Sequence, residues 1–248
     1  MSDLLPHLLL VMGTFTLAGL VKGVSGLGLP TVAMGLLGLA MPPAEAAALL
    51  LVPSLVTNVW QLLAGPRIGA LLRRLWGMML GVVTGTLAGS GLIAGTAGPA
   101  ATAALGGALA LYGVVGLLKP RLRVPAAAEP WAGPLVGVAT GLVTGATGVF
   151  VVPAVPYLGS LGLERDDLVQ ALGLSFTIST LALAAGLAWH GALPTGAAGA
   201  SLLALVPSLT GMVLGGYLRA RVRPETFRLC FFAGLLVLGA ELFWRGLT

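Results

Sequence analysis

Charged residues are scarce in this sequence. Only 8% of the 248 residues are charged, 13 of them Lys or Arg and 8 Asp or Glu. A soluble domain usually has about a quarter of its residues charged, because its surface must be wetted. The composition therefore excludes a soluble enzyme and a disordered chain. It also argues against a nucleic-acid partner despite the net charge of +5, because the basic residues sit in short clusters between long uncharged runs.

Cysteine and histidine are almost absent as well. Cys230 is the single cysteine, which excludes a disulfide framework, a thiolate metal site and a two-cysteine redox pair. The two histidines, His7 and His190, form no His-x-x-x-His or Glu-x-x-His pair, so we expect neither a metal nor a cofactor. Residues 23–26 have the Gly-x-Ser-Gly form of intramembrane serine proteases, but that mechanism needs a histidine base beside the serine. We therefore expect no catalytic residues.

Long apolar runs rich in glycine fill the remaining sequence. Hydrophobic residues make up 57% of the chain, and 38 residues are glycine, a composition typical of closely packed membrane helices. A helical crossing needs about 20 apolar residues. By this measure the sequence predicts six full crossings, at residues 45–65, 74–95, 99–118, 167–189, 194–218 and 226–246.

Two further apolar segments are interrupted. Residues 6–21 are followed by a glycine-rich stretch and then by residues 31–40, which are too few to cross a bilayer. Residues 132–143 and 153–161 repeat this arrangement around a second glycine-rich stretch. We expect both segments to be broken or re-entrant helices.

The two interruptions are copies of each other. Residues 19–26 (GLVKGVSG) align with residues 141–148 (GLVTGATG), and Thr84-Gly85 falls opposite Thr210-Gly211. The predicted fold is thus an all-α polytopic membrane protein with two inverted repeats, each a broken helix plus three crossings. The repeats are residues 1–120 and 131–248, with a cytoplasmic linker at 121–130. Paired interrupted segments in corresponding positions are typical of a transporter binding site.

Loop charges predict the topology. If each broken segment returns to its own side, 11 of the 13 basic residues lie on one face. They are Arg67, Arg73, Arg74, Lys119, Arg121, Arg123, Arg165, Arg219, Arg221, Arg223 and Arg228. The positive-inside rule makes this face cytoplasmic and places both termini in the periplasm.

Lys22 is the strongest candidate for binding a ligand. An ammonium group inside a membrane segment is costly and usually faces a polar cavity or a partner, so we expect it to attract a small anion. The alternatives are that Lys22 snorkels to the interface or pairs with a carbonyl group. Hydroxyl, amide and backbone N–H groups should complete the site. The predicted substrate-binding residues are Lys22, Gly23, Ser25, Gly26, Gly28, Asn58, Gln61, Thr144, Gly145, Thr147, Gly148, Gln170 and Ser175.

Simpler roles remain open for the uncharged members of this set. The threonines of the second interruption could only cap a broken helix. Ser54, Thr57, Asn58 and Gln61 follow the spacing i, i+3, i+4, i+7 and form a polar stripe, which could serve only hydrogen bonding between helices. The matching positions of the stripes in the two halves favour a shared pathway.

These motifs resemble the TauE/SafE family of sulfite and organosulfonate exporters. The resemblance rests on the duplicated Gly-Leu-Val-x-Gly-x-[Ser/Thr]-Gly segments, on residues 42–46 (PPAEA) and on residues 168–176 (LVQALGLSF). It implies transport of a sulfur-containing anion, such as sulfite or an organosulfonate like sulfoacetate, across the bacterial inner membrane. The expected partners are this small anionic substrate and the lipid bilayer, without nucleic acid; a homodimer is an open alternative to a monomer. The rival hypothesis is a non-transporting membrane protein, either an intramembrane protease or an assembly factor.

Overall fold

The fold is all-helical throughout the residues that the computed structural model describes, which are 4–95, 98–118, 122–193 and 196–248. The first half contributes α1 (Leu4–Ser25), α2 (Leu29–Leu37), α3 (Pro43–Leu63), α4 (Ile68–Ala94) and α5 (Gly98–Leu118). A short 3₁₀ turn, η1 (Ala126–Ala128), leads into the second half. That half contributes α6 (Glu129–Thr147), α7 (Ala154–Ser160), α8 (Arg165–Trp189), α9 (Ala197–Leu218) and α10 (Pro224–Arg245).

Seven of the described helices are long and apolar enough to cross a membrane. Six of them, α3, α4, α5, α8, α9 and α10, cover the six predicted crossings. The seventh lies within α1, at Pro6–Ser25. The prediction of a polytopic α-helical membrane protein is therefore confirmed, although Pro194, where one predicted crossing begins, lies outside the described residues.

The first interruption begins later than the sequence predicts. Helix α1 continues through Lys22 and Gly23 as far as Ser25, and its 22 residues reach about 33 Å. The chain leaves the helix at Gly26 and Gly28, whose φ angles of 77° and 98° are left-handed and favour glycine. The expectation that the first helical segment ends at residue 21 is thus wrong. In a lipid environment a helix keeps its internal hydrogen bonds wherever it can.

The second interruption has the same form. Helix α6 extends through Thr144, Gly145 and Thr147, and the chain turns at Gly148, whose φ is 72°. The expectation that this segment ends at residue 143 is wrong for the same reason. In both halves the glycines just before the break serve helix packing, and the turn is made by the glycine that follows.

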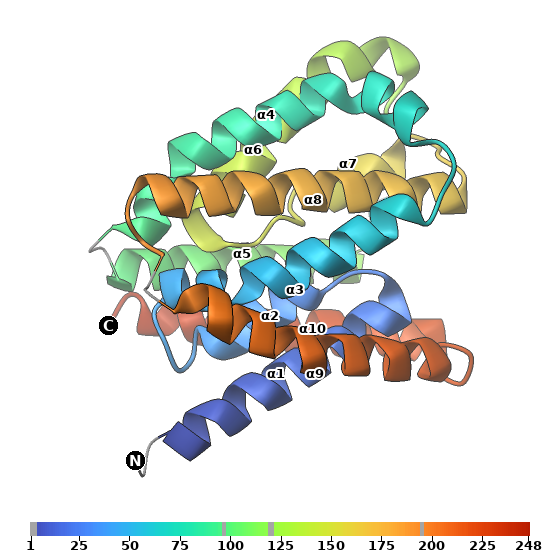
Figure 1. Cartoon of the computed structure of the whole chain (residues 1–248). Helices are drawn as coiled ribbons and strands as arrows, with labels where there is room; N and C mark the ends of the chain where they lie inside the picture. The colour runs from blue at the N-terminus through green and yellow to red at the C-terminus, as the bar shows by residue number, and fades with distance from the viewer. Residues whose placement is uncertain (1–3, 96–97, 119–121, 194–195) are drawn as a thin grey trace.

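Glycines bring the helices together in the same register in the two halves. Figure 1 shows α1 beside α9 and α4 beside α6, two of the most extensively packed pairs. A Cβ atom on Gly19 of α1 would lie 2.1 Å from the Ser208 carbonyl oxygen of α9. A Cβ atom on Gly141 of α6 would lie 2.4 Å from the Val82 carbonyl oxygen of α4. At both contacts the backbones touch directly, as in other small-residue membrane interfaces.

The reverse contacts repeat this register. A Cβ atom on Gly211 of α9 would meet the Thr16 carbonyl oxygen, and one on Gly85 of α4 would meet the Val138 carbonyl oxygen. Gly85 and Gly211 occupy corresponding positions in the two repeats of the sequence. The remaining large contacts, α3 with α8 and α5 with α10, also join one half to the other. The two halves are therefore interlocked.

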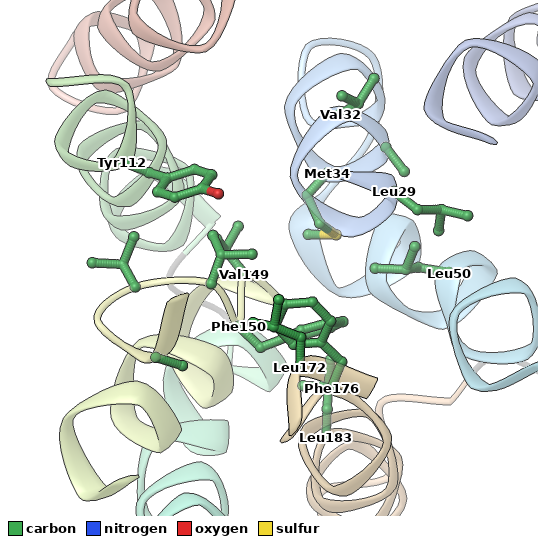
Figure 2. Packing of buried hydrophobic residues seen from close by; sticks show 14 of the residues in the cluster. Leu29, Val32, Met34, Leu50, Tyr112, Val149, Phe150, Leu172, Phe176 and Leu183 are labelled. Carbon is green, nitrogen blue, oxygen red and sulfur yellow. The ribbon is translucent and has the colours of Figure 1, made fainter. Parts of the chain in front are cut away.

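The centre of the molecule is filled by apolar side chains from both interruptions. Figure 2 shows Met34 of α2 near Val149 and Phe150, which follow α6. Phe150 packs on Phe176 of α8, with ring centroids 5.3 Å apart. All four side chains are buried. We call these four buried side chains the apolar plug.

A proline inside α3 is accommodated by a hydroxyl group from the other half. Pro53 has no N–H group to donate to the carbonyl oxygen of Leu49. The Ser201 hydroxyl of α9 donates to that oxygen at 2.8 Å and accepts from the Val52 N–H at 3.0 Å. The backbone group freed by the proline is thereby satisfied, as a bilayer interior requires.

Both described ends of the chain lie toward one end of the helical bundle in Figure 1, and the α3–α4 and α9–α10 connections lie toward the other. The α3–α4 connection carries Arg67, with Arg73 and Arg74 early in α4, and the α9–α10 connection carries the arginines of residues 219–223. Arg165, at the start of α8, borders one cavity together with Arg219 of the α9–α10 connection. The predicted sorting of arginines to one face agrees with this arrangement. Lys119 and Arg121, with the start of the predicted linker, lie outside the described residues.

Candidate functional site

Lys22 is a buried cation in the last turn of α1. Its side chain is 4% exposed, and its ammonium group donates a hydrogen bond to Oδ1 of Asn58 on α3. Across the described residues no carboxylate lies within ion-pair distance of this ammonium group. Its position near the C-terminal end of a helix, where the helix dipole is negative, adds a favourable interaction. Lys22 thus pairs with a side-chain carbonyl oxygen, and the described residues offer it no carboxylate counter-ion.

Asn58 links this cation to the second half of the chain. Its side chain is fully buried, and Nδ2 donates to the Thr180 hydroxyl of α8 at 3.4 Å. The Thr180 hydroxyl in turn donates to the carbonyl oxygen of Phe176. Lys22 donates to the Asn58 carbonyl oxygen, so the orientation of the Asn58 amide group is fixed. The series of hydrogen bonds links α1, α3 and α8 beside the Lys22 ammonium group.

A cavity of about 260 Å³ opens beside Lys22. Its polar lining comes from the ends of α1, α3 and α9, and consists of Lys22, Gly23, Gly26, Thr57, Gln61 and Arg219. Two cations, one buried and one at an exposed position, thus border one small space. Four of the predicted site residues, Lys22, Gly23, Gly26 and Gln61, meet at this cavity.

Gln61 offers an unused acceptor at the cavity. Its Nε2 donates to the Val169 carbonyl oxygen at 3.0 Å, which fixes the amide plane. Its Oε1 is buried and has no hydrogen-bond partner in the described part of the chain. Such a group is normally satisfied by protein or by water.

Gln170 is fully occupied by the backbone. Its Nε2 donates to the carbonyl oxygens of Leu62 and Gly65, and its Oε1 accepts from the Arg67 N–H at 3.0 Å. The neighbouring Asp167 accepts from Arg67 Nη1 at 2.8 Å. In this conformation Gln170 therefore holds the α3–α4 turn against α8.

The hydroxyl groups at the two breaks cap their helices. Ser25 donates to the Val21 carbonyl oxygen and accepts from the Leu27 N–H at 3.1 Å. Thr147 donates to the Val143 carbonyl oxygen and accepts from the Val149 N–H at 3.1 Å. The two halves thus use one capping arrangement, which is the simpler of the two roles left open for Thr147.

The other predicted residues lie away from the 260 Å³ cavity. Thr144 donates to the Thr140 carbonyl oxygen, and Gly145 packs against Thr86 of α4. Gly148 lies against Met34, and Gly28 lies against Phe231. Ser175 is fully buried, and its hydroxyl has no partner among the residues described. The structure therefore brings the first break, but not the second, to the cavity.

Arg219 is the main site residue that the sequence analysis did not single out. The sequence places it among the loop arginines, directly after a long charge-free run at residues 168–218. The close packing of α1 on α9 places it at the cavity. Trp60 also borders this space. The sequence contains one weak indication of this role, because Arg219 is the first charged residue after α9.

No group of three or more potential metal ligands forms within the described ranges. The hydrogen bonds of the Ser25 hydroxyl go to backbone groups of its own turn. This geometry gives the Gly-x-Ser-Gly segment a capping role.

The sequence profile of the family described as sulfite exporter TauE/SafE matches residues 11–242 of this chain. Neither a curated protein nor a solved structure matches it. The match covers nearly all of the described helices, from α1 to the last turns of α10. The chain therefore belongs to the TauE/SafE family of sulfite exporters, membrane transporters of sulfite-type anions.

Proposed function

We propose that the protein transports a small sulfur-containing anion, sulfite or an organosulfonate such as sulfoacetate, across the bacterial inner membrane. The observation that carries the proposal is the buried Lys22 ammonium group, which has no carboxylate partner in the described residues and borders a small cavity. An uncompensated charge in a membrane interior is costly unless a ligand neutralises it. A bound oxyanion would supply that counter-charge.

The second cation strengthens this proposal. Arg219 borders the same cavity, and a guanidinium group binds planar pairs of oxyanion oxygens better than an ammonium group does. Lys22 would then hold the anion at the buried end of the cavity, and Arg219 would attract it at the other. The volume of about 260 Å³ lies below the range of about 300–1,000 Å³ that is usual for drug-sized ligands. It suits a small ion.

Unpaired hydroxyl groups deeper in the molecule support a path beyond Lys22. The hydroxyls of Ser54, Ser175 and Ser179 are buried and have no partner in the described part of α3 and α8. Together with Asn58 and Gln61 they form polar positions along the two central helices. Transient hydrogen bonds from these groups would replace part of the anion's hydration shell as it passes.

We further propose that the path opens alternately to the two sides by rocking of inverted repeats. The matched registers of α1 on α9 and α6 on α4 support a duplication. In Figure 1, α3 and α8 lie alongside each other with opposite chain directions, as inverted repeats require. The apolar plug at Phe150 and Phe176 would close the far side in the conformation described.

A flux assay in proteoliposomes tests the proposal. Vesicles with the purified protein are given sulfite, sulfoacetate or taurine, each with and without a pH gradient. We expect protein-dependent movement of at least one of these solutes. The absence of flux for every one of them would contradict transport and would favour the assembly-factor alternative.

The protease alternative has its own test in the same preparation. A Ser25→Ala variant should keep transport, because the Ser25 hydroxyl caps α1 and lines no part of the Lys22 cavity. Cleavage of a membrane-embedded peptide by the wild-type protein but not by this variant would establish the protease instead.

A further inference from the structure

We propose that the cavity beside Lys22 selects a monoanion that also carries an O–H group, as hydrogensulfite does, and that Gln61 and Thr57 make this selection. The inference rests on the proposed transport function and narrows its substrate from a sulfur-containing anion to the protonated form of that anion. Three features of the cavity carry it: the number of its buried charges, the free acceptor atom of Gln61 and the hydrogen bond that Thr57 donates.

The cavity contains one buried charge. Of the described residues that line it, Lys22 and Arg219 alone are ionisable, and Lys22 is buried whereas Arg219 is exposed. An exposed guanidinium group is screened by water and compensates a nearby anion only weakly. A charge inside a protein is costly unless a buried partner neutralises it. One ammonium group therefore matches a monoanion, whereas a sulfite dianion would keep one charge without a buried partner.

Gln61 offers the ligand an acceptor and not a donor. Its Nε2 donates to the Val169 carbonyl oxygen at 3.0 Å, and its Oε1 is buried with no partner among the residues that the structure describes. The amide group cannot turn to present Nε2 to the cavity without giving up the hydrogen bond to Val169. A bare oxygen of an anion is repelled by an amide oxygen, whereas an O–H group of the anion would donate to it.

Packing against α8 holds Gln61 in this position. A Cβ atom on Gly173 of α8 would lie 2.9 Å from the backbone carbonyl carbon of Gln61, so α3 and α8 touch at this residue. Val169, which accepts from Gln61, lies one turn earlier on α8 and also lines the cavity. The orientation of the Gln61 amide is therefore set by α8, and a ligand has to match it.

Thr57 adds a second acceptor one turn before Gln61 on α3. Its side chain is buried, lines the cavity and donates its hydroxyl proton to the Pro53 carbonyl oxygen at 2.7 Å. A hydroxyl group has a single proton, so Thr57 can only accept from a ligand. Lys22 supplies the donors, because an ammonium group has three N–H bonds and one of them goes to Asn58. A ligand with both charged oxygens and an O–H group fits this pattern.

Other charged groups lie close to this end of α3 but do not line the cavity. The helices α4 and α8, which pack against α3, contribute the Arg67–Asp167 ion pair and the other charges of their first two turns. None of these residues borders the space beside Lys22. Methanesulfonate is a suitable reference anion, because it has one charge at every working pH and a methyl group where hydrogensulfite has its hydroxyl. A pH effect on its affinity would come from the protein and not from the ligand.

Affinities for sulfite and methanesulfonate test the proposal, measured from about pH 6 to about pH 8.5 with the full chain in nanodiscs. Hydrogensulfite loses its proton near neutral pH, so we expect the affinity for total sulfite to fall about tenfold over this range. Methanesulfonate affinity should stay constant. At the acidic end, sulfite should bind about tenfold more tightly than methanesulfonate, because it alone donates to Gln61. A rise in sulfite affinity with pH, as a dianion site would give, would overturn the proposal.

Two variants remove the acceptors one at a time. Gln61→Met should abolish the preference for sulfite over methanesulfonate at the acidic end, and Thr57→Val should reduce it. Thr57→Val keeps the shape of the side chain, so it serves as the test if the melting temperature shows that Gln61→Met unfolds. Thr84→Val is the matched control, because the exposed Thr84 hydroxyl also donates to carbonyl oxygens of its own helix and does not line the cavity. An unchanged preference in the folded acceptor variants would overturn the proposal.

Failure of the transport function would look different. Lys22→Met should bind neither anion, whereas Arg221→Gln should bind both as the wild-type protein does, because Arg221 is exposed and does not line the cavity. If wild-type protein binds sulfite and methanesulfonate equally at the acidic end, and Lys22→Met binds neither, water satisfies Gln61 and selection by the O–H group is overturned while the Lys22 site stands. Binding of both anions that does not depend on Lys22 would overturn this inference and the proposed function together.

Discussion

At the scale of single residues, Lys22 shows how a membrane helix can hold a buried cation without a carboxylate. The Asn58 carbonyl oxygen accepts from it, and the negative end of the α1 dipole lies nearby. Both interactions are weaker than an ion pair in a medium of low dielectric constant. They therefore stabilise the charge enough for folding while leaving it attractive to an anion.

This balance can be shifted by one substitution. In Asn58→Asp the new carboxylate would lie where Oδ1 now accepts from Lys22, and it would form an ion pair with the ammonium group. Because the internal carboxylate competes with the ligand, we expect sulfite affinity to fall at least tenfold while the melting temperature stays the same or rises. Isothermal titration calorimetry and thermal unfolding in one detergent measure both quantities.

A control separates charge from packing in that experiment. The double substitution Lys22→Met and Asn58→Leu removes both polar groups together, so it leaves no buried charge unpaired. It should fold and bind no sulfite. Full sulfite affinity in Asn58→Asp would show that Lys22 is not the group that the anion approaches.

The sequence identified these residues only in part. Lys22 is evident, because a lone charge in an apolar run is conspicuous, and Asn58 lies on a polar stripe. Arg219 is not evident, because its role depends on the packing of α1 against α9, which brings distant segments together. Gln170 was grouped with the site, but its amide is held by three backbone groups that belong to a turn about a hundred positions away.

At the scale of helices, the glycine-rich segments serve packing more than unwinding. The sequence correctly indicates that something unusual happens at residues 19–26 and 141–148, and that the two segments correspond. It cannot separate a glycine that allows close approach from one that allows a left-handed turn. Gly19 and Gly23 are of the first kind and Gly26 is of the second, and only the position of α9 decides this.

Close approach at Gly19 predicts a specific loss of stability. A Cβ atom there would lie 2.1 Å from the Ser208 carbonyl oxygen, so Gly19→Ala must push α1 away from α9. We expect the free energy of unfolding to fall by about 1–3 kcal/mol, as for other overpacked contacts. Chemical denaturation in detergent, followed by circular dichroism, measures this change.

Gly13 provides the matched control on the same helix. A Cβ atom at Gly13 would meet no atom within 4 Å, so Gly13→Ala should be neutral or slightly stabilising. An equal loss of stability in both variants would argue against the backbone contact between α1 and α9.

At the scale of the whole molecule, charge and hydropathy predict the helical spans well. All six predicted crossings correspond to helices that are long and apolar enough to span a membrane. Such spans are local properties, set by about 20 consecutive apolar residues. The length of α1 and the interlocking of the halves are not local, because they depend on glycine contacts between segments nearly 200 positions apart.

The placement of the termini remains a prediction at this scale. Positive residues at the α3–α4 and α9–α10 connections favour a cytoplasmic location for that end, which puts the C-terminus in the periplasm. A C-terminal alkaline phosphatase fusion should therefore be active, whereas a fusion at the α3–α4 connection should be inactive. The reverse pattern would invert the proposed topology.

The central claim is that Lys22 binds the transported anion, and flux through the Lys22→Met variant tests it most directly. Methionine keeps much of the side-chain length but carries no charge, so the variant should insert and fold. With the solute that the wild-type protein moves, we expect at least a hundredfold lower initial rate in proteoliposomes, and no such loss in Arg221→Gln. Wild-type flux through folded Lys22→Met would contradict the account.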